Sequence, residues 1–405
     1  MAQARYLYPC AELCYKPSIE SKINPWVEGS VPLSRTLHST SPFPLADWEH
    51  QDAAFADAFQ VLQDAIAARA FPACSVAVTH QGKLVALKAL GHFTYEADAE
   101  PVSNASIFDV ASLTKVIATT AITMILYERG LVDLEMPVVG IIPEFAANDP
   151  RREAVTMQML LAHSSGLPAY EKLFLRARTR EEVLSAALTT PLAADPCTRA
   201  KYSDIGFIVL GVALESIADE PLDAFSQREI FGPLGMSHTC FNPPASWRAS
   251  IPPTADDRTF RNRIIQGEVQ DENASVLGGV AGHAGVFATA QDIATFAHVM
   301  LSGGAPILRP ATISLFTNRQ SNPPGTSRAL GWDTPSSPSQ SGRHFSSPSF
   351  GHLGYTGTSL WVDPERQLSV TLLTNRTWPD CTNKAIKEVR PKFHDAVIEA
   401  LEKSR

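Results

Sequence analysis

Apolar residues recur every three or four positions over residues 55–66, at Phe55, Phe59, Leu62 and Ile66. This spacing places them on one face of a helix, so the sequence predicts an amphipathic helix that ends before Phe71-Pro72. The helix is expected to cover a sheet, because strand-like sequence follows it directly.

Strand-like runs occur near both ends of the chain. Residues 74–90 read as two strands joined by a turn at Gln81-Gly82, the pattern of a β-hairpin. Residues 357–363 and 368–375 read as a second pair of strands. The sequence therefore predicts one antiparallel sheet built from both ends of the chain.

Helical patterns dominate the middle of the chain and define the expected organisation. We expect an α/β (α+β) fold in which an antiparallel sheet is flanked by helices and carries an inserted, mostly helical lobe. The sheet lobe is assigned to about 47–111 and 301–405, and the helical lobe to about 112–300. Residues 1–46 lack helical or strand periodicity and are expected to form a tail or arm. Residues 320–350, rich in Ser, Pro and Gly, are expected to form an exposed loop.

Composition excludes several classes of function. Hydrophobic residues make up 44% of the chain and charged residues 19%, with a net charge of −8 and no long Lys/Arg run. This balance is typical of a globular protein and not of a nucleic-acid binder.

There is no uncharged apolar stretch of membrane-spanning length and no secretory h-region near the start, so a cytoplasmic protein is expected. No C-x-x-C or H-E-x-x-H spacing indicates a metal site, and the sequence does not define an oligomeric state.

The first candidate chemistry is the pair Ser112 and Lys115, three residues apart in the apolar stretch 106–130. On a helix this spacing brings the two side chains within reach, and a buried lysine that releases its proton can activate a serine. The alternative is a helix-capping serine beside a surface lysine. Lys115 interrupts an otherwise apolar segment, where a charge is unfavourable without partners, and this favours the catalytic interpretation.

Two further segments place polar residues next to a predicted helix and a predicted strand. Tyr202 and Asp204 stand at the entrance of the apolar helix 205–218, where Ser203 or Asp204 could alternatively serve only as a cap. His352 and Gly354 precede a predicted strand, where glycines allow close approach of a ligand, although a simple turn between strands would read the same way.

These elements, in this order, resemble the family of class C β-lactamases, D-alanyl-D-alanine carboxypeptidases and family VIII carboxylesterases. The family pattern is S-x-x-K, then Y-x-N or a variant, then K-T-G or H-x-G. The resemblance runs from about residue 48 to the end of the chain and includes the passages MLLAHSSGLP, IFGPLGM and GHLGYTGTSLWVDPE.

The resemblance implies a β-lactamase/transpeptidase-like fold and a serine hydrolase that works through an acyl-enzyme without metal or organic cofactor. Ser112 would be the nucleophile, and Lys115 and Tyr202 would share the proton transfers. The sequence does not distinguish which of the two is the principal base. The backbone N–H groups of Ser112 and Tyr355 would form the oxyanion hole.

The resemblance also assigns substrate contacts to Asp204, His352 and Gly354. Asp204 stands where penicillin-recognising members usually have Asn, and His352 where β-lactamases usually have Lys. Both changes weaken the expectation of lactam turnover. A small-molecule carboxylic ester is therefore the expected substrate, with a D-alanyl peptide or a β-lactam as alternatives. An inactive binding or scaffold protein of the same fold is the alternative of another class.

Two other segments contain residues that resemble known functional motifs. Residues 162–166 (AHSSG) approach the G-x-S-x-G nucleophile elbow, which would make Ser164 the nucleophile of an α/β-hydrolase. Leu167-Pro168 follows where that elbow requires a helix, so we expect only a loop near the site. The glycine-rich residues 277–285 lack the Lys-Ser/Thr pair of a phosphate-binding loop, and that interpretation is rejected.

Overall fold

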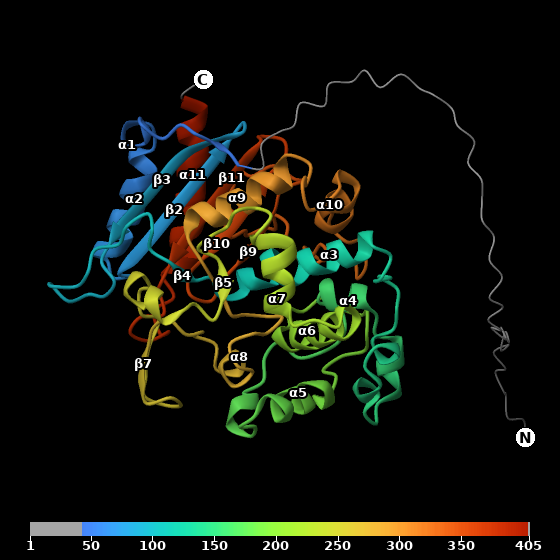
Figure 1. Ribbon diagram of the computed structural model, residues 1–405. Coiled ribbons are helices and arrows are strands. Elements are labelled where there is room, and N and C mark those ends of the chain that lie inside the picture. Colours follow the sequence, from blue (N-terminus) through green and yellow to red (C-terminus); the bar gives the residue numbers. More distant parts are fainter. Residues whose placement is uncertain (1–42, 404–405) are drawn as a thin grey trace, which may run out of the picture. The chain divides into compact units, whose positions relative to one another are not determined.

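A six-stranded sheet forms the centre of the computed structural model, which describes residues 43–403 (Figure 1). The strands follow the order β1-β3-β2-β11-β10-β9, and every neighbouring pair is antiparallel except β1 with β3. Their bounds are β1 Leu45–Ala46, β2 Ala73–His80, β3 Lys83–Gly91, β9 Phe350–Leu353, β10 Ser359–Asp363 and β11 Leu368–Thr374. The prediction of an antiparallel sheet from both ends of the chain is confirmed.

The predicted hairpin is present as β2 and β3. Gln81 and Gly82 have φ angles of 50° and 79°. Two consecutive left-handed residues are the geometry of a type I′ turn, which matches the twist of antiparallel strands. The expected arm over residues 1–46 lies outside the described residues except for its last four, and two of these form β1 beside β3.

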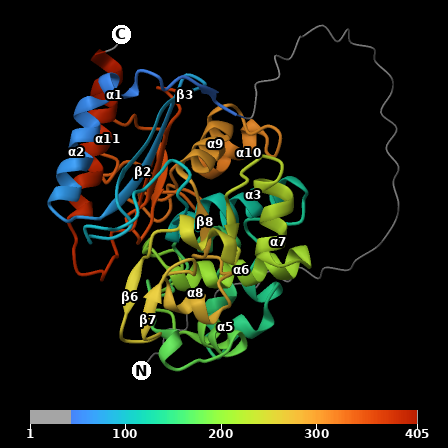
Figure 2. The same cartoon turned by 60° about the vertical axis from the view of Figure 1, so that its left-hand side comes forward.

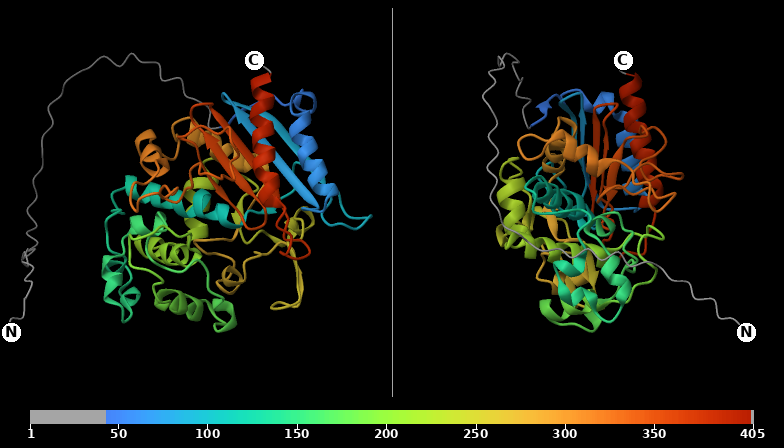
Figure 3. Two further views of the ribbon diagram at one scale, coloured as in Figure 1. Left: turned by 180° about the vertical axis from the view of Figure 1, so that it is seen from behind. Right: turned by 90° about the vertical axis from the view of Figure 1, so that its right-hand side faces the viewer.

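Helices cover both faces of the sheet, as the turned views show (Figures 2 and 3). On one face lie α1 (Gln51–Ala54), α2 (Ala56–Ala67) and α11 (Ile386–Lys403), and on the other lies α9 (Ala290–Leu301). Because both faces are buried, β2 is apolar on both sides and reads as a nearly continuous hydrophobic run. The sequence predicts that α9 belongs to the helical lobe, but α9 packs against β2, β10 and β11. Its residues are buried nearly all round, so the sequence did not show which layer it joins.

The inserted lobe holds the remaining helices and two small sheets. The helices are α3 Ala121–Glu128, α4 Met157–Leu161, α5 Arg180–Thr189, α6 Asp204–Ala218, α7 Leu222–Ser226, α8 Glu272–Val276 and α10 Pro310–Thr317. The small sheets are β4 Phe108–Asp109, β8 Val286–Ala288 and β5 Cys240–Phe241, and the pair β6 Ala255–Asp257 with β7 Arg263–Ile265. None of the helices in residues 43–403 is long and apolar enough to cross a bilayer.

The segment 320–350 is only partly the exposed loop that we expected. Leu330 and Trp332 are buried, and the Trp332 ring packs edge-on against Phe350 with ring centroids 5.0 Å apart. These few large apolar side chains outweigh the Ser and Pro content, because each buries a large area.

Candidate active site

Ser112 lies on a sharp turn between β4 and the first buried helix. It is the second residue of a short 3-10 helix, η1 (Ala111–Leu113), whose first residue has a φ of 48°. Left-handed backbone is unfavourable for alanine and persists only where neighbours hold it. The buried Asp109 does so: its Oδ1 accepts from the Ala111 N–H at 2.8 Å, and its Oδ2 accepts from the Gln270 N–H at 2.7 Å.

Lys115 is fully buried at the start of the next helical turn, η2 (Lys115–Thr120), and all its donors are used. Its Nζ donates to Ser112 Oγ at 3.0 Å, to Asp204 Oδ1 at 2.6 Å and to the carbonyl of His283 at 2.9 Å. The structure therefore brings the serine and lysine of the S-x-x-K motif into direct contact. The surface-lysine alternative is wrong.

Tyr202 and Asp204 complete the group from the N-terminus of α6. The Tyr202 hydroxyl lies 2.7 Å from Ser112 Oγ and 3.0 Å from Asp204 Oδ1, and its single proton can go to either. Ser203, not Asp204, caps the helix, because its Oγ accepts from the Gly206 N–H at 2.9 Å. Asp204 is thereby left to face Lys115.

Burial moves the two proton-carrying groups in opposite directions. It lowers the pKa of Lys115, although the carboxylate of Asp204 opposes part of this change. It raises the pKa of Tyr202 well above its usual value, and here Asp204 adds to the effect. The lysine is thus the group that loses its proton more readily than usual, while the tyrosine remains a phenol.

The loop after β9 is tied directly to the segment that precedes Ser112. Thr356 Oγ1 donates to the Asp109 carbonyl at 2.8 Å, and Thr358 Oγ1 donates to the Val110 carbonyl at 3.0 Å. A Cβ on Gly354 would lie 1.9 Å from Thr358 Oγ1, so only glycine allows this approach. Within the described residues the Tyr355 N–H has no hydrogen-bond acceptor.

A buried arginine from α11 holds the same loop. Arg390 donates to the carbonyls of Gly354, Gly357 and Thr358 at 2.7, 3.2 and 2.8 Å. The side chain is buried, and these acceptors are backbone groups, not carboxylates. The sequence interpretation missed Arg390, because no motif includes it.

His352 lies within β9, where it pairs with Leu360 of β10. Its Nδ1 hydrogen-bonds the Leu353 carbonyl at 2.8 Å, and its buried Nε2 has no partner among the described residues. Its ring lies 6.0 Å from that of Tyr202. Burial and the nearby Lys115 lower the pKa of His352 well below its usual value, so the imidazole is neutral at pH 7.

Ser164 does not sit in a nucleophile elbow. It follows the short helix α4 instead of a strand, and no helix starts directly after it. Its neighbour His163 accepts a hydrogen bond from the Ser203 N–H at 3.1 Å, so this histidine supports the Tyr202 segment.

The glycine-rich residues 277–285 have a role that the sequence interpretation missed. They supply the His283 carbonyl to Lys115 and the Gly282 carbonyl to Thr119 Oγ1, at 2.9 and 2.7 Å. A Cβ on Gly282 would lie 2.1 Å from the Phe207 carbonyl, so the segment passes very close to α6. The cluster of glycines was the available signal for this close approach.

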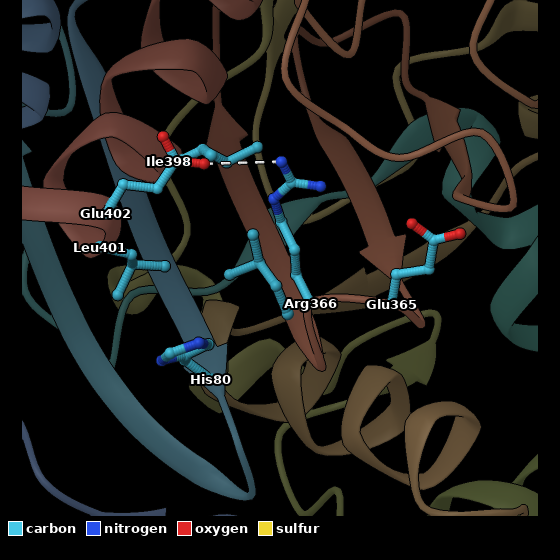
Figure 4. A pocket seen from close by; sticks show the side chains of 7 residues that line it. His80, Glu365, Arg366, Ile398, Leu401 and Glu402 are labelled. Carbon is cyan, nitrogen blue, oxygen red and sulfur yellow. Dashed lines mark ion pairs between the residues drawn. The ribbon is translucent and has the colours of Figure 1, made fainter. Parts of the chain in front are cut away.

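A separate pocket lies between the β10–β11 turn and α11, at the end of β10 opposite to the loop at 354–358 (Figure 4). Its lining includes His80, Glu365, Arg366 and Glu402, and it contains none of the predicted site residues. No cluster of three or more His, Cys, Asp or Glu side chains in residues 43–403 is arranged to hold a metal ion.

The chain is similar to known proteins over most of its length. The sequence profile of the β-lactamase family matches residues 58–389. The N-acetylmuramyl-L-alanine amidase of Bacillus subtilis (strain 168) is 30% identical over 354 residues, which cover 78% of this chain and 80% of the amidase.

Two solved structures share the fold at low sequence identity. EstCE1, a hydrolase with promiscuous acyltransferase activity, has a TM-score of 0.70 and 21% identity, covering 86% of this chain and 99% of its own. A penicillin-binding protein homologue from Caulobacter crescentus has a TM-score of 0.69 and 17% identity, covering 86% and 97%. With the family profile spanning most of its length, the chain belongs to the β-lactamase family of serine hydrolases, which act on ester or amide bonds.

Proposed function

We propose that the chain hydrolyses a carboxylic ester through an acyl-enzyme formed on Ser112. The observation that carries this proposal is the position of Ser112 Oγ, which lies 3.0 Å from Lys115 Nζ and 2.7 Å from the Tyr202 hydroxyl. A nucleophile needs a base and a proton donor at this range.

In this mechanism Lys115 in its neutral form takes the Ser112 proton while Oγ attacks the substrate carbonyl carbon. The N–H groups of Ser112 and Tyr355 stabilise the negative oxygen that forms. The bond from the carbonyl carbon to the alcohol oxygen then breaks. The alcohol leaves with a proton from Tyr202, which is replenished from Lys115. Water repeats the attack on the acyl-enzyme, and the acid and the free serine are released.

The lowered pKa of Lys115 and the raised pKa of Tyr202 support this division of roles. A base must lose its proton near the working pH, whereas a phenol with a raised pKa is a better proton donor than acceptor.

Asp204 supports an ester over an amide or lactam. Its Oδ1 accepts from Lys115 and lies within hydrogen-bond distance of Tyr202, and a carboxylate has no N–H to donate to an acyl-amide carbonyl of the substrate. An amide substrate is the second candidate, and it is favoured by the 30% identity to an N-acetylmuramyl-L-alanine amidase over 78% of this chain.

The test is hydrolysis of short-chain p-nitrophenyl esters beside a chromogenic cephalosporin, a D-Ala-D-Ala peptide and N-acetylmuramyl-L-alanine. Purified wild type is compared with Ser112→Ala and with Ser164→Ala, which makes the same change at a nearby buried serine. Ester turnover that Ser112→Ala abolishes and Ser164→Ala retains is expected. Turnover of only the amide substrates would replace the ester with the second candidate, and activity that survives Ser112→Ala would overturn the mechanism.

A further inference from the structure

Arg328 lies beside the catalytic group but belongs to none of the three motifs. Its guanidinium carbon is 5.6 Å from the centre of the Tyr202 ring, and its side chain is 20% exposed. Its positive charge contributes to lowering the pKa values of Lys115, His163 and His352, so its field reaches across the site.

Most N–H groups of the Arg328 guanidinium have no hydrogen-bond partner in residues 43–403. Within the described residues its guanidinium makes no hydrogen bond, and its one ion pair joins Nη1 to Asp333 Oδ2 at 3.6 Å. The other oxygen of Asp333 already accepts from Ser327 Oγ at 2.7 Å and from the Thr334 N–H at 3.1 Å. At least four of the five N–H groups of Arg328 therefore have no hydrogen-bond partner within the described residues.

The structural arginines of this chain differ in this respect. Arg152, Arg261 and Arg390 each donate to three acceptors, which lie on backbone carbonyls and one aspartate. These three arginines serve the fold and each donates three hydrogen bonds, whereas the guanidinium of Arg328 donates none within the described residues.

The backbone of Arg328 is nevertheless fixed. Its N–H donates to Thr326 Oγ1 at 3.0 Å, and its carbonyl accepts from the Gln320 N–H at 2.8 Å. The chain then enters the buried stretch that contains Leu330 and Trp332. The backbone hydrogen bonds thus fix Arg328 near the site, while its guanidinium N–H groups donate no hydrogen bond to the described part of the fold.

Two buried polar atoms without partners lie around the same tyrosine. His352 Nε2 and His163 Nε2 have no hydrogen-bond partner among the described residues, and their rings lie 6.0 and 4.8 Å from the Tyr202 ring. Their Nδ1 contacts assign a free acceptor to His352 and a free N–H donor to His163. A buried polar atom without a partner is unfavourable, and an ordered water or a bound group can supply the hydrogen bond that it lacks.

We propose that Arg328 binds a carboxylate of the substrate, so that the favoured ester carries a carboxylate close to the bond that is cleaved. A guanidinium presents two parallel N–H groups that match a carboxylate. His352 is neutral, and Lys115 is engaged by Asp204, so Arg328 supplies the positive charge for this contact. The inference rests on the proposed acyl-enzyme function and adds the substrate class.

The test compares each acidic substrate with a neutral partner. One series consists of mono-p-nitrophenyl esters of dicarboxylic acids with four to six carbons, each beside its methyl-capped form. A second series places the carboxylate on the leaving group, as carboxyphenyl butyrate beside its methyl ester. Wild type, Arg328→Gln and Arg328→Lys are measured, with Arg309→Gln as a control that removes an exposed positive charge elsewhere.

In wild type, kcat/KM is expected to favour the acidic partner in at least one series. Arg328→Gln is expected to lower that ratio about 10- to 100-fold, the range for a charge-assisted hydrogen bond. Arg328→Lys restores part of the ratio, and Arg309→Gln leaves it unchanged. Equal losses for acidic and neutral partners, or no preference in wild type in either series, would overturn the proposal.

A direct binding measurement separates this inference from the proposed function. If wild type hydrolyses neither partner, the ester proposal has failed. Calorimetric binding of adipate and of butyrate to the Ser112→Ala protein still tests Arg328. Tighter binding of adipate that Arg328→Gln removes would support the anion site, and equal binding by both proteins would contradict it.

Discussion

The two sides of the active site are built in different ways. On the helical side, the side chains of Lys115 and Tyr202 contact Ser112, the proposed nucleophile, and Asp204 contacts both of them. On the sheet side, the loop at 354–358 contributes backbone groups to the site. Arg390 and the hydroxyls of Thr356 and Thr358 hold this loop in place. In the proposed mechanism, proton transfer would therefore depend on which side chains are present, whereas oxyanion binding would depend on how firmly the backbone is held.

The largest effect is expected from removing the base on the helical side. Lys115→Met keeps an unbranched side chain of similar length but cannot take the Ser112 proton. We expect kcat/KM for an ester to fall on the order of 10³-fold. Circular dichroism and the unfolding midpoint check that the protein still folds. Retention of more than about a tenth of the activity would show that Tyr202 or water replaces the lysine.

An intermediate effect is expected on the sheet side. Arg390→Gln removes the three hydrogen bonds that Arg390 donates to the carbonyls of Gly354, Gly357 and Thr358. We therefore expect kcat to fall about 10- to 100-fold with little change in KM. Arg390→Lys is expected to recover part of kcat.

The matched control is Arg152→Gln. Arg152 is also buried and donates to three carbonyls, those of Phe145, Leu188 and Thr190, in the helical lobe. Both variants are expected to lower the unfolding free energy by about 2 to 3 kcal/mol. If both also lower kcat equally, Arg390 acts only through stability and the assigned positioning role is wrong.

The smallest effect is expected from Asp204→Asn, which changes the pKa values of Lys115 and Tyr202 but leaves both side chains in place. Asp204 raises the pKa of Lys115 and of Tyr202, so its removal lowers both. The rising limb of the plot of kcat/KM against pH is therefore expected to move to lower pH. Asp64→Asn on α2 makes the same substitution at an exposed aspartate and should leave the limb in place. If the rising limb does not move in Asp204→Asn, Asp204 does not influence the proton transfers.

The contacts of Ser112 with Lys115 and Tyr202 on the helical side could be predicted from the sequence, because these residue types form recognisable motifs. Ser112 and Lys115 are three residues apart, and Tyr202 stands at the entrance of an apolar helix. The resemblance to the S-x-x-K and Y-x-N family pattern predicted that the three side chains lie together. The sheet side was harder, because carbonyl acceptors carry no sequence signature. Arg390 did leave a signal: Ile386, Val389, Phe393 and Val397 follow helical spacing and place it on the buried face of α11.

The same contrast holds for the fold. The strands β2, β3, β10 and β11 contain apolar runs that the sequence shows directly. The strand β9 is short and contains Gly351, which weakens strand propensity, so the sequence does not predict a strand there. Arg328 was missed because its segment is dominated by Ser and Pro, and its place beside Tyr202 arises only from the tertiary fold.

The most direct test of the account is the site of covalent acylation. Wild type, Ser112→Ala and Ser164→Ala are treated with a fluorophosphonate and with a slowly turned-over ester, and the intact masses and labelled peptides are measured. The account predicts a single adduct on the peptide that contains Ser112, present in wild type and in Ser164→Ala and absent from Ser112→Ala. An adduct on the peptide that contains Ser164, or labelling that persists in Ser112→Ala, would contradict it.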